Sequence, residues 1–265
     1  MSSDEGFVFF VCILLAIVGW GWYYLHAFSA TTIGSLPTRR GILNLTPLLC
    51  LVLLFVILKL FASHDVRDDG TYLAFYLLMG AAWVPLAMWL LPLVGLDPRR
   101  DAIHRRNPAA VIAVVAAMIG LTLCFAGGNI GDGPGWWVVL FAAVLSTGSL
   151  LLLWALVEWV TDLSDAITID RDIASAVRLG GFLVACGAIL GRAVAGDWES
   201  AGATVSDFVR IAWPVVLLAF AQVVLQRLLQ PAPQRPAPGT LMGGVVPAVV
   251  FILIAAVYLV VIGWW

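Results

Sequence analysis

Charged residues are scarce in this sequence. Only 11% of its 265 residues are Asp, Glu, Lys or Arg, against about a quarter in ordinary globular domains. A soluble fold would need more charge to cover its surface, because 62% of the residues are hydrophobic. The formal net charge of −2 is also unlike the concentrated basic face that nucleic acid requires. The composition therefore excludes an ordinary soluble domain and argues against a nucleic-acid partner.

The patterns of known catalytic and metal sites are also missing. His26, His64 and His104 fall on different loops, so they cannot meet around one zinc ion. The sequence has no HExxH motif and no Ser/His/Asp set on one face. The four cysteines each lie inside an apolar run, in no metal-type spacing: Cys12, Cys50, Cys124 and Cys186. We expect buried thiols, no enzymatic activity, no cofactor and no metal.

Long apolar runs are what the sequence does contain. A bilayer core of about 30 Å needs about 20 apolar residues in a helix. Lipid offers backbone groups no hydrogen-bond partner, and the runs are too long for the strands of a barrel. Eight segments have the required length: approximately 7–27, 42–61, 72–95, 109–127, 136–160, 173–195, 206–228 and 243–264. We predict an all-α, polytopic transmembrane helical bundle of about eight helices.

Arginine is distributed unevenly between the two sets of loops. The loops after helices one, three, five and seven carry Arg39, Arg40, Arg99, Arg100, Arg105, Arg106, Arg171, Arg227 and Arg235. The other loops hold Arg67 and Arg192, with Lys59 at a helix end, and are rich in Asp and Glu. Since basic loops stay in the cytoplasm, we predict a multi-pass protein of the bacterial inner membrane with both termini in the periplasm.

Proline and glycine predict where helices bend or meet. Pro47, Pro85 and Pro214 lie within helices and should kink them, freeing carbonyls that packing must satisfy. Gly187 and Gly191 form a GxxxG spacing, which predicts a packing seam or a protomer interface.

Two segments of the sequence repeat each other. RRNPAA (105–110) aligns with DRDIAS (170–175), and both copies run in the same direction across the membrane. Three steps match at an offset of 65 residues: Arg106 with Arg171, Asn107 with Asp172, and Gly131-Asp132 with Gly196-Asp197. Asn107 and Asp172 are good N-caps, so each unit is predicted to be a helix, a Gly-Asp turn and a returning helix, giving two parallel two-helix repeats.

These repeats divide the chain into four parts. The predicted boundaries are 1–103 for an N-terminal three-helix membrane region, 104–166 for the first repeat, 167–229 for the second, and 230–265 for a proline-rich linker with a C-terminal membrane helix.

The two units, RRNPAAVIAVVAAMIGLTLCFAGGNIGDGPGWW and DRDIASAVRLGGFLVACGAILGRAVAGDWES, resemble a bacterial inner-membrane family. This is the family called domain of unknown function 350, of the YjfL type, and the likeness suggests two tandem copies over roughly residues 104–228. The resemblance implies an inner-membrane protein and brings no established activity. It also implies gene neighbourhoods associated with envelope stress, which is a hint about partners.

The glycine-rich stretch AGGNIGDGPGWW (126–137) invites comparison with a phosphate-binding loop. It lacks the Lys-Ser/Thr ending of a P-loop and follows a helix rather than a strand. We interpret it as a tight turn anchored by a tryptophan pair. The alternative is an outward-facing site in which Asn129, Asp132 and turn carbonyls bind a cation or a polar solute.

Charges within or beside the helices supply the remaining candidates. Glu158 and Arg178 should reach similar depth on neighbouring helices, so we predict an ion pair or a shared polar pocket, which is also the candidate transport site. Arg105, Arg106 and Arg171 are candidate contacts to lipid phosphates, with anionic lipid as the partner. In the loop HDVRDDG, three acids could hold a hard cation: Asp65, Asp68 and Asp69.

Two classes of function remain open from the sequence. The first is a non-enzymatic membrane scaffold or envelope-stress-associated partner, expected to act as a homo-oligomer or as a subunit of a membrane complex. The second is a channel or transporter for an ion or small solute, using the region of Glu158 and Arg178. The scarcity of charge within the helices favours the first class.

Overall fold

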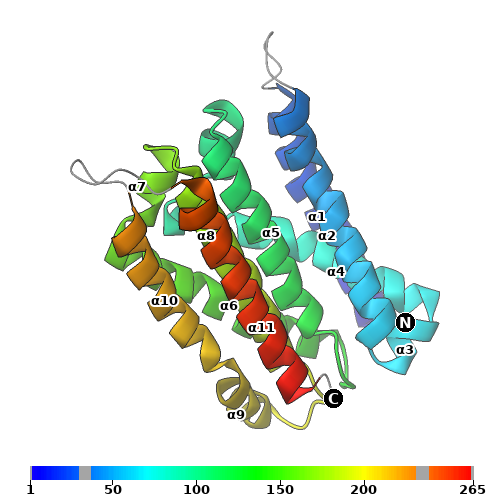
Figure 1. Ribbon diagram of the computed structural model, residues 1–265. Coiled ribbons are helices and arrows are strands. Elements are labelled where there is room, and N and C mark those ends of the chain that lie inside the picture. The colour runs from blue at the N-terminus through cyan, green and yellow to red at the C-terminus, as the bar shows by residue number, and fades with distance from the viewer. Residues whose placement is uncertain (1, 30–36, 231–238, 264–265) are drawn as a thin grey trace.

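The structure is a computed structural model that describes residues 2–29, 37–230 and 239–263 (Figure 1). All regular elements in these residues are helical. The long helices are α1 (Ser3–Ser29), α2 (Pro37–Phe61), α4 (Gly70–Met88), α5 (Pro108–Gly127), α6 (Trp136–Thr161), α8 (Ile173–Ala193), α9 (Ala201–Ala212), α10 (Pro214–Leu229) and α11 (Val246–Ile262). The short ones are α3 (His64–Asp68), η1 (Leu91–Val94), η2 (Pro98–His104), α7 (Leu163–Thr168) and η3 (Leu241–Val245).

The fold class expected from the sequence is confirmed. Within the described ranges, seven helices are long and apolar enough to cross a membrane, and α9 with α10 makes an eighth span if the bent pair is counted as one. Large apolar side chains remain exposed along the outer helices, for example Trp159 at 82% and Val261 at 77%. Such a surface suits lipid rather than water. The chain is therefore a multi-pass membrane protein.

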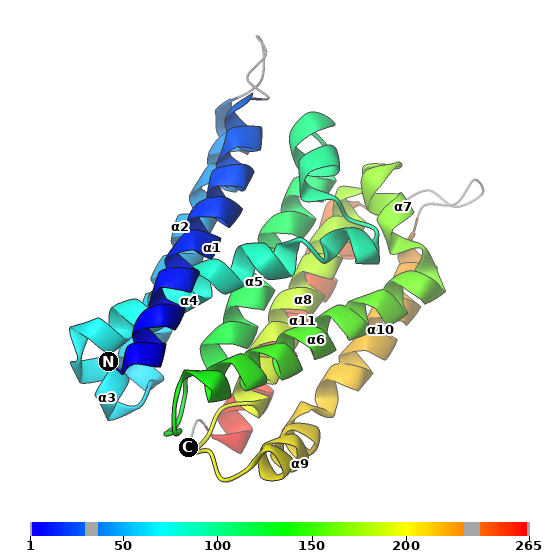
Figure 2. The same ribbon diagram turned by 180° about the vertical axis from the view of Figure 1, so that it is seen from behind.

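The helices run between two chemically different ends of the bundle. Figures 1 and 2 place the start of α1, α3, the turn between α5 and α6, and the end of α11 at one end, which we call the acidic end. They place η2, α7 and the start of α8 at the other, which we call the arginine-rich end. Which of these two ends of the bundle faces the cytoplasm stays a prediction. The proline-rich linker of the sequence falls mostly on 231–238, outside the described residues.

The centre of the bundle is the parallel contact between α5 and α8, the most extensive in the fold. A Cβ at Gly120 would lie 2.8 Å from the carbonyl oxygen of Leu183, and one at Gly187 would lie 2.6 Å from the carbonyl oxygen of Gly120. Gly127 and Gly191 meet backbone to backbone in the same way. The GxxxG glycines therefore form a packing seam inside this chain, where small residues let two backbones approach.

Two helix-interior prolines are compensated by aromatic side chains of α1. Pro47 cannot donate to the carbonyl of Leu43, and that carbonyl accepts a hydrogen bond from the Tyr23 hydroxyl at 2.9 Å. Pro85 leaves the carbonyl of Ala81 free in the same way. The indole Nε1 of Trp20 donates to it at 2.7 Å. The sequence predicted these freed carbonyls, and packing against α1 satisfies both.

Proline also explains where the predicted helix limits differ from the structure. The third predicted span, 72–95, is too long, because the helix ends at Met88, three residues after Pro85, and a 3₁₀ turn containing Pro92 follows. The seventh, 206–228, is divided at Pro214, where α9 and α10 meet at an angle of 44°. Pro47 lies inside an unbroken α2.

Substitution of Gly187 tests the central contact. We expect Gly187→Leu to lower the free energy of unfolding by at least about 1–3 kcal/mol, the usual cost of overpacking, because its side chain meets the backbone of Gly120. Gly148→Leu is the matched control, since nothing lies within 4 Å of a Cβ there, and it should change stability by less than about 0.5 kcal/mol. Unfolding in detergent measures both, and equal losses would contradict the contact.

Candidate functional site

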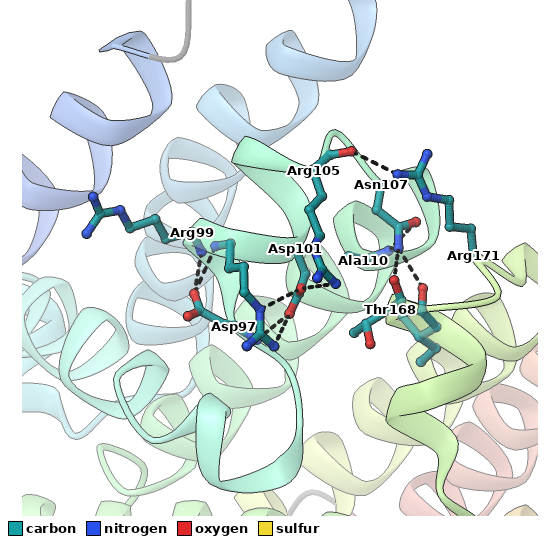
Figure 3. A network of polar contacts seen from close by, with 10 residues as sticks. Asp97, Arg99, Asp101, Arg105, Asn107, Ala110, Thr168 and Arg171 are labelled. Carbon is teal, nitrogen blue, oxygen red and sulfur yellow. Dashed lines mark hydrogen bonds and ion pairs between the residues drawn. The ribbon is translucent and has the colours of Figure 1, made fainter.

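A buried asparagine connects the two repeated segments at the arginine-rich end (Figure 3). Asn107 Oδ1 accepts hydrogen bonds from the backbone N–H groups of Ala109 at 3.0 Å and Ala110 at 3.4 Å, so it caps α5 as predicted. Its Nδ2 donates to the carbonyl of Ile167 at 2.7 Å, and that of Thr168 lies at 3.4 Å. One side chain thus starts α5 and holds the end of α7.

Next to Asn107 lies a fully buried acid, Asp101, on the π-helix η2. Its carboxylate accepts from Arg100 Nε at 3.0 Å and pairs with Arg105 Nη1 at 3.5 Å (Figure 3). The backbone N–H of Asp97 donates to it at 3.0 Å. The hydrogen bond from Arg100 to Asp101 raises the pKa of the Arg100 guanidinium. A buried carboxylate with these partners organises the loop, because its burial without them would be costly.

The repeated segments have matching backbone geometry at the offset of 65 residues. Arg106 and Arg171 both have positive φ, 51° and 56°, which is uncommon for residues other than glycine. Asp172 accepts from the N–H groups of Ala174 at 3.1 Å and Ser175 at 3.0 Å, so it caps α8 as Asn107 caps α5. These are local likenesses, and the duplication of a whole unit stays a prediction.

The three candidate lipid-phosphate arginines lie together at this end. Arg105 contacts Asp101, and the backbone carbonyl of Arg105 accepts from Arg171 Nη2 at 3.4 Å (Figure 3). Arg106 directly follows Arg105 in the chain and has the positive φ described above. Part of this arginine cluster therefore holds the loops in place, and its contact with lipid stays a prediction.

Arg178 is fully buried and belongs to a polar network that sequence reasoning missed. Its guanidinium donates to the Gly243 carbonyl of η3, to Oε1 of Gln226 on α10, and to Oγ of Ser175 at 3.1 Å. The Ser175 hydroxyl in turn donates to Oδ2 of Asp172 at 2.6 Å. The network therefore joins α8, α10 and the start of the last membrane helix.

The predicted pairing of Glu158 with Arg178 is wrong. Glu158 accepts from the Ser164 hydroxyl at 2.5 Å and from the Ser164 backbone N–H at 2.8 Å, at the start of α7. In the part of the chain that the structure describes, no ion pair includes either residue. Equal depth on neighbouring helices is not enough, because each side chain has polar partners on other elements.

The glycine-rich loop 128–135 is hydrogen-bonded to the neighbouring loop of the acidic end, which contains Asp197 and Trp198. The Asp132 N–H donates to Oδ1 of Asp197 at 2.8 Å, and the Trp198 N–H donates to the Asp132 carbonyl at 2.7 Å. Gly131 and Gly196 both have positive φ, 106° and 138°, as tight turns allow for glycine. The stretch therefore forms the connection between α5 and α6, and the anchoring of its tryptophan pair stays a prediction. Asn129 and Asp132 line one small pocket there, and binding to them stays a prediction.

The acidic loop before α4 uses its side chains locally. His64 Nε2 lies 2.8 Å from Asp68 Oδ2. Asp69 Oδ1 accepts from the Thr71 N–H at 2.6 Å, which caps α4 and lowers the pKa of the Asp69 carboxyl. Residues 2–29, 37–230 and 239–263 contain no group of three or more His, Cys, Asp or Glu side chains placed to hold a metal ion. The structure therefore offers no such cluster at Asp65, Asp68 and Asp69.

The sequence did contain a signal for the Arg178 network. Gln222 and Gln226 are four residues apart in an apolar segment, so they lie on one face of a helix, and both are fully buried. Two glutamines on one face of a membrane helix indicate a polar contact with another helix. For Gln226 that contact comes from Arg178, 48 residues earlier in the chain, whereas the Gln222 amide has no hydrogen-bond partner among the described residues.

Removal of the Asn107 side chain tests the connection between the segments. We expect Asn107→Ala to lower stability by about 1–3 kcal/mol, because buried backbone groups lose their partners. Asn107→Ser keeps a capping oxygen but cannot reach the Ile167 carbonyl, so it should lose less. Thermal unfolding of the purified protein measures both. A serine variant as stable as the wild type would mean that the bond to the Ile167 carbonyl contributes nothing.

Double-mutant cycles separate the true partners of Arg178 from the expected one. Arg178→Gln combined with Gln226→Leu should show a coupling energy of about 0.5–3 kcal/mol, as residues in one network do. Glu158→Gln combined with Arg178→Gln should be additive within about 0.5 kcal/mol. Stability measurements on the three single and two double variants decide, and the reverse result would restore the predicted pair.

Comparison with protein families agrees with the resemblance seen in the sequence. Residues 63–194 match the family model described as Domain of Unknown Function (DUF350). The limits expected from the sequence, 104–228, lie too far toward the C-terminus. The matched segment includes α4 and ends before α9 and α10. The arrangement in two tandem copies stays a prediction. No curated protein and no solved structure matches the chain. Through residues 63–194 this multi-pass membrane protein belongs to the DUF350 family.

Proposed function

We propose that the chain is a non-enzymatic scaffold of the bacterial inner membrane, acting as a homo-oligomer or as a subunit of a membrane complex. The observation that carries the proposal is the direct connection of the two repeated segments at both ends of a glycine-packed core. Asn107 connects them at one end, and Asp132 with Asp197 at the other. Such a core keeps the loops of both ends in place, which is what a docking platform requires.

The arginine-rich end is the proposed docking side. In the proposed orientation it faces the cytoplasm, and both termini face the periplasm, because basic loops stay inside. Arg105, Arg106 and Arg171 then meet the anionic surface of the inner leaflet, which attracts basic residues with about 1 kcal/mol each. The family resemblance suggests envelope-stress proteins as the first partners to test.

Exposed apolar helix faces support the proposal of an oligomer or complex. The outward side of α11 exposes Val257, Val260 and Val261. In a membrane such faces can contact either lipid or another helix, because both neighbours are apolar. We therefore propose that association uses these outer faces rather than the glycine seam, which α5 and α8 already occupy.

A channel or transporter is the second candidate, and one observation favours it. Both amide atoms of Gln222 and Nε of Arg178 are buried without hydrogen-bond partners in the described structure. Unpaired buried polar groups are costly, and they mark solute paths in some membrane proteins. In this reading the path passes Arg178 and Gln222, and Glu158 has no part in it.

Two measurements on the full chain distinguish these functions. A scaffold should give proteoliposomes with no ion flux above empty vesicles, and should purify from native membrane with a stoichiometric partner or as an oligomer. Arg106→Glu should reduce that association, whereas Arg67→Glu, the control at the acidic end, should not. Flux in the wild type that Arg178→Gln abolishes would overturn the scaffold and support transport.

A further inference from the structure

A cleft at the arginine-rich end has no role in the proposed scaffold. It lies between α1, the end of α4 and η2, and we call it the α1–η2 cleft. Its main walls and mouth are formed by Trp20, Trp22, Tyr23, Trp89, Pro92 and Arg99. Its cavity volume of about 230 Å³ is far above the 10–15 Å³ or so that one water needs. A mostly aromatic and proline lining suits an apolar chain.

The walls of the cleft are held in place by bonds that also satisfy their polar atoms. Trp20 Nε1 donates to the Ala81 carbonyl and the Tyr23 hydroxyl to the Leu43 carbonyl, at 2.7 and 2.9 Å. Each bond gives a donor to a carbonyl that lacks its usual helical hydrogen bond, because the residue four positions later is a proline without an N–H. The two rings therefore offer carbon surface to the cleft, and a ligand there meets a preformed wall rather than a mobile one.

The mouth of the cleft carries a cation that points away from the Asp101 network. Arg99 is exposed, and its guanidinium lies over the Trp22 ring, 6.0 Å from the ring centroid. Figure 3 shows its side chain pointing away from Asp101, whereas Arg100 and Arg105 contact that acid. The Nε of Arg99 donates to His104 at 3.3 Å. The remaining donors of this guanidinium suit an anionic oxygen.

One carboxylate, that of Asp97, also lines the cleft. Its Oδ1 accepts from the backbone N–H groups of Arg99 at 2.9 Å and Arg100 at 3.0 Å. These bonds hold the carboxylate within its own loop, where it caps the start of η2. The charged group that lies over the Trp22 ring is therefore the Arg99 guanidinium.

The surroundings place the cleft at the membrane–water boundary. Trp22 and Trp89 are 40% and 48% exposed, and Leu93 beside them is 79% exposed. Tryptophan collects at this boundary, with arginine reaching the lipid phosphates. A molecule that fits must combine an apolar chain with an anionic group at this depth.

We propose that the α1–η2 cleft binds one anionic glycerophospholipid of the surrounding leaflet. The phosphate lies on Arg99, and an acyl chain lies along Trp20, Trp89 and Pro92. A lipid with net negative charge is preferred over a zwitterionic one, because an ethanolamine ammonium would add a second cation beside Arg99. The site goes beyond the scaffold function and is compatible with transport as well.

The test compares two lipids on the purified full-length protein in nanodiscs. Phosphatidylglycerol and phosphatidylethanolamine with the same acyl chains are mixed equally, and native mass spectrometry counts the lipids retained after release in detergent. We expect the wild type to retain one phosphatidylglycerol in about fivefold preference, the equivalent of one basic residue at an anionic surface. Arg99→Gln should abolish the preference, and Arg67→Gln at the acidic end should keep it.

A second readout uses the aromatic wall. Phosphatidylglycerol with brominated acyl chains should quench part of the tryptophan fluorescence at about one lipid per chain, and Trp89→Phe should reduce that part. No preference in the wild type, an unchanged preference in Arg99→Gln, or an equal loss in Arg67→Gln would each overturn the proposal. None of these results depends on flux or on partner recovery, so the scaffold function is tested separately.

Discussion

Backbone contact between α5 and α8 is the constraint on which the rest of the structure depends. At Gly120, Gly127, Gly187 and Gly191 the two helices approach until no side chain fits between them. Lipid gives helices little hydrophobic reason to associate, so close van der Waals contact is the main source of their attraction. Because the two helices run parallel in contact, their starts meet at one end and their ends at the other. The capping residue Asn107 can therefore reach α7, and the loop at Asp132 can reach that at Asp197.

The outer helices pack on this core through buried apolar side chains, and polar bonds at defined points add to that packing. Aromatic residues of α1 satisfy the carbonyls freed by Pro47 and Pro85. Arg178 holds the start of the last membrane helix through the Gly243 carbonyl and holds α10 through Gln226. In an apolar medium a lost partner is not replaced by water, so such bonds select one arrangement among many with similar packing. The bonds of Trp20 and Tyr23 also hold two walls of the α1–η2 cleft in place.

The two ends of the bundle differ in chemistry in a way that suits different tasks. At the acidic end the loops bind each other, and the aspartates serve as turn and capping residues. At the arginine-rich end a buried acid, Asp101, organises Arg100 and Arg105, while Arg99 points toward α1 and the cleft. The second end thus combines a rigid loop structure with cationic groups at the membrane boundary. Those are the features of a surface that meets lipid headgroups or a partner.

Features that depend on short-range rules could be predicted from the sequence. Membrane spans follow from the length of apolar runs, and the caps at Asn107 and Asp172 follow from residue type and position. The positions of the freed carbonyls follow from proline chemistry. Which groups meet across helices depends instead on how the helices pack. Arg178 contacts Gln226, not Glu158, and Asp101 is buried although it lies in an arginine-rich loop. Depth in the membrane can be estimated from a sequence, but the rotation of each helix is set by packing against its neighbours, and rotation decides which side chain faces which.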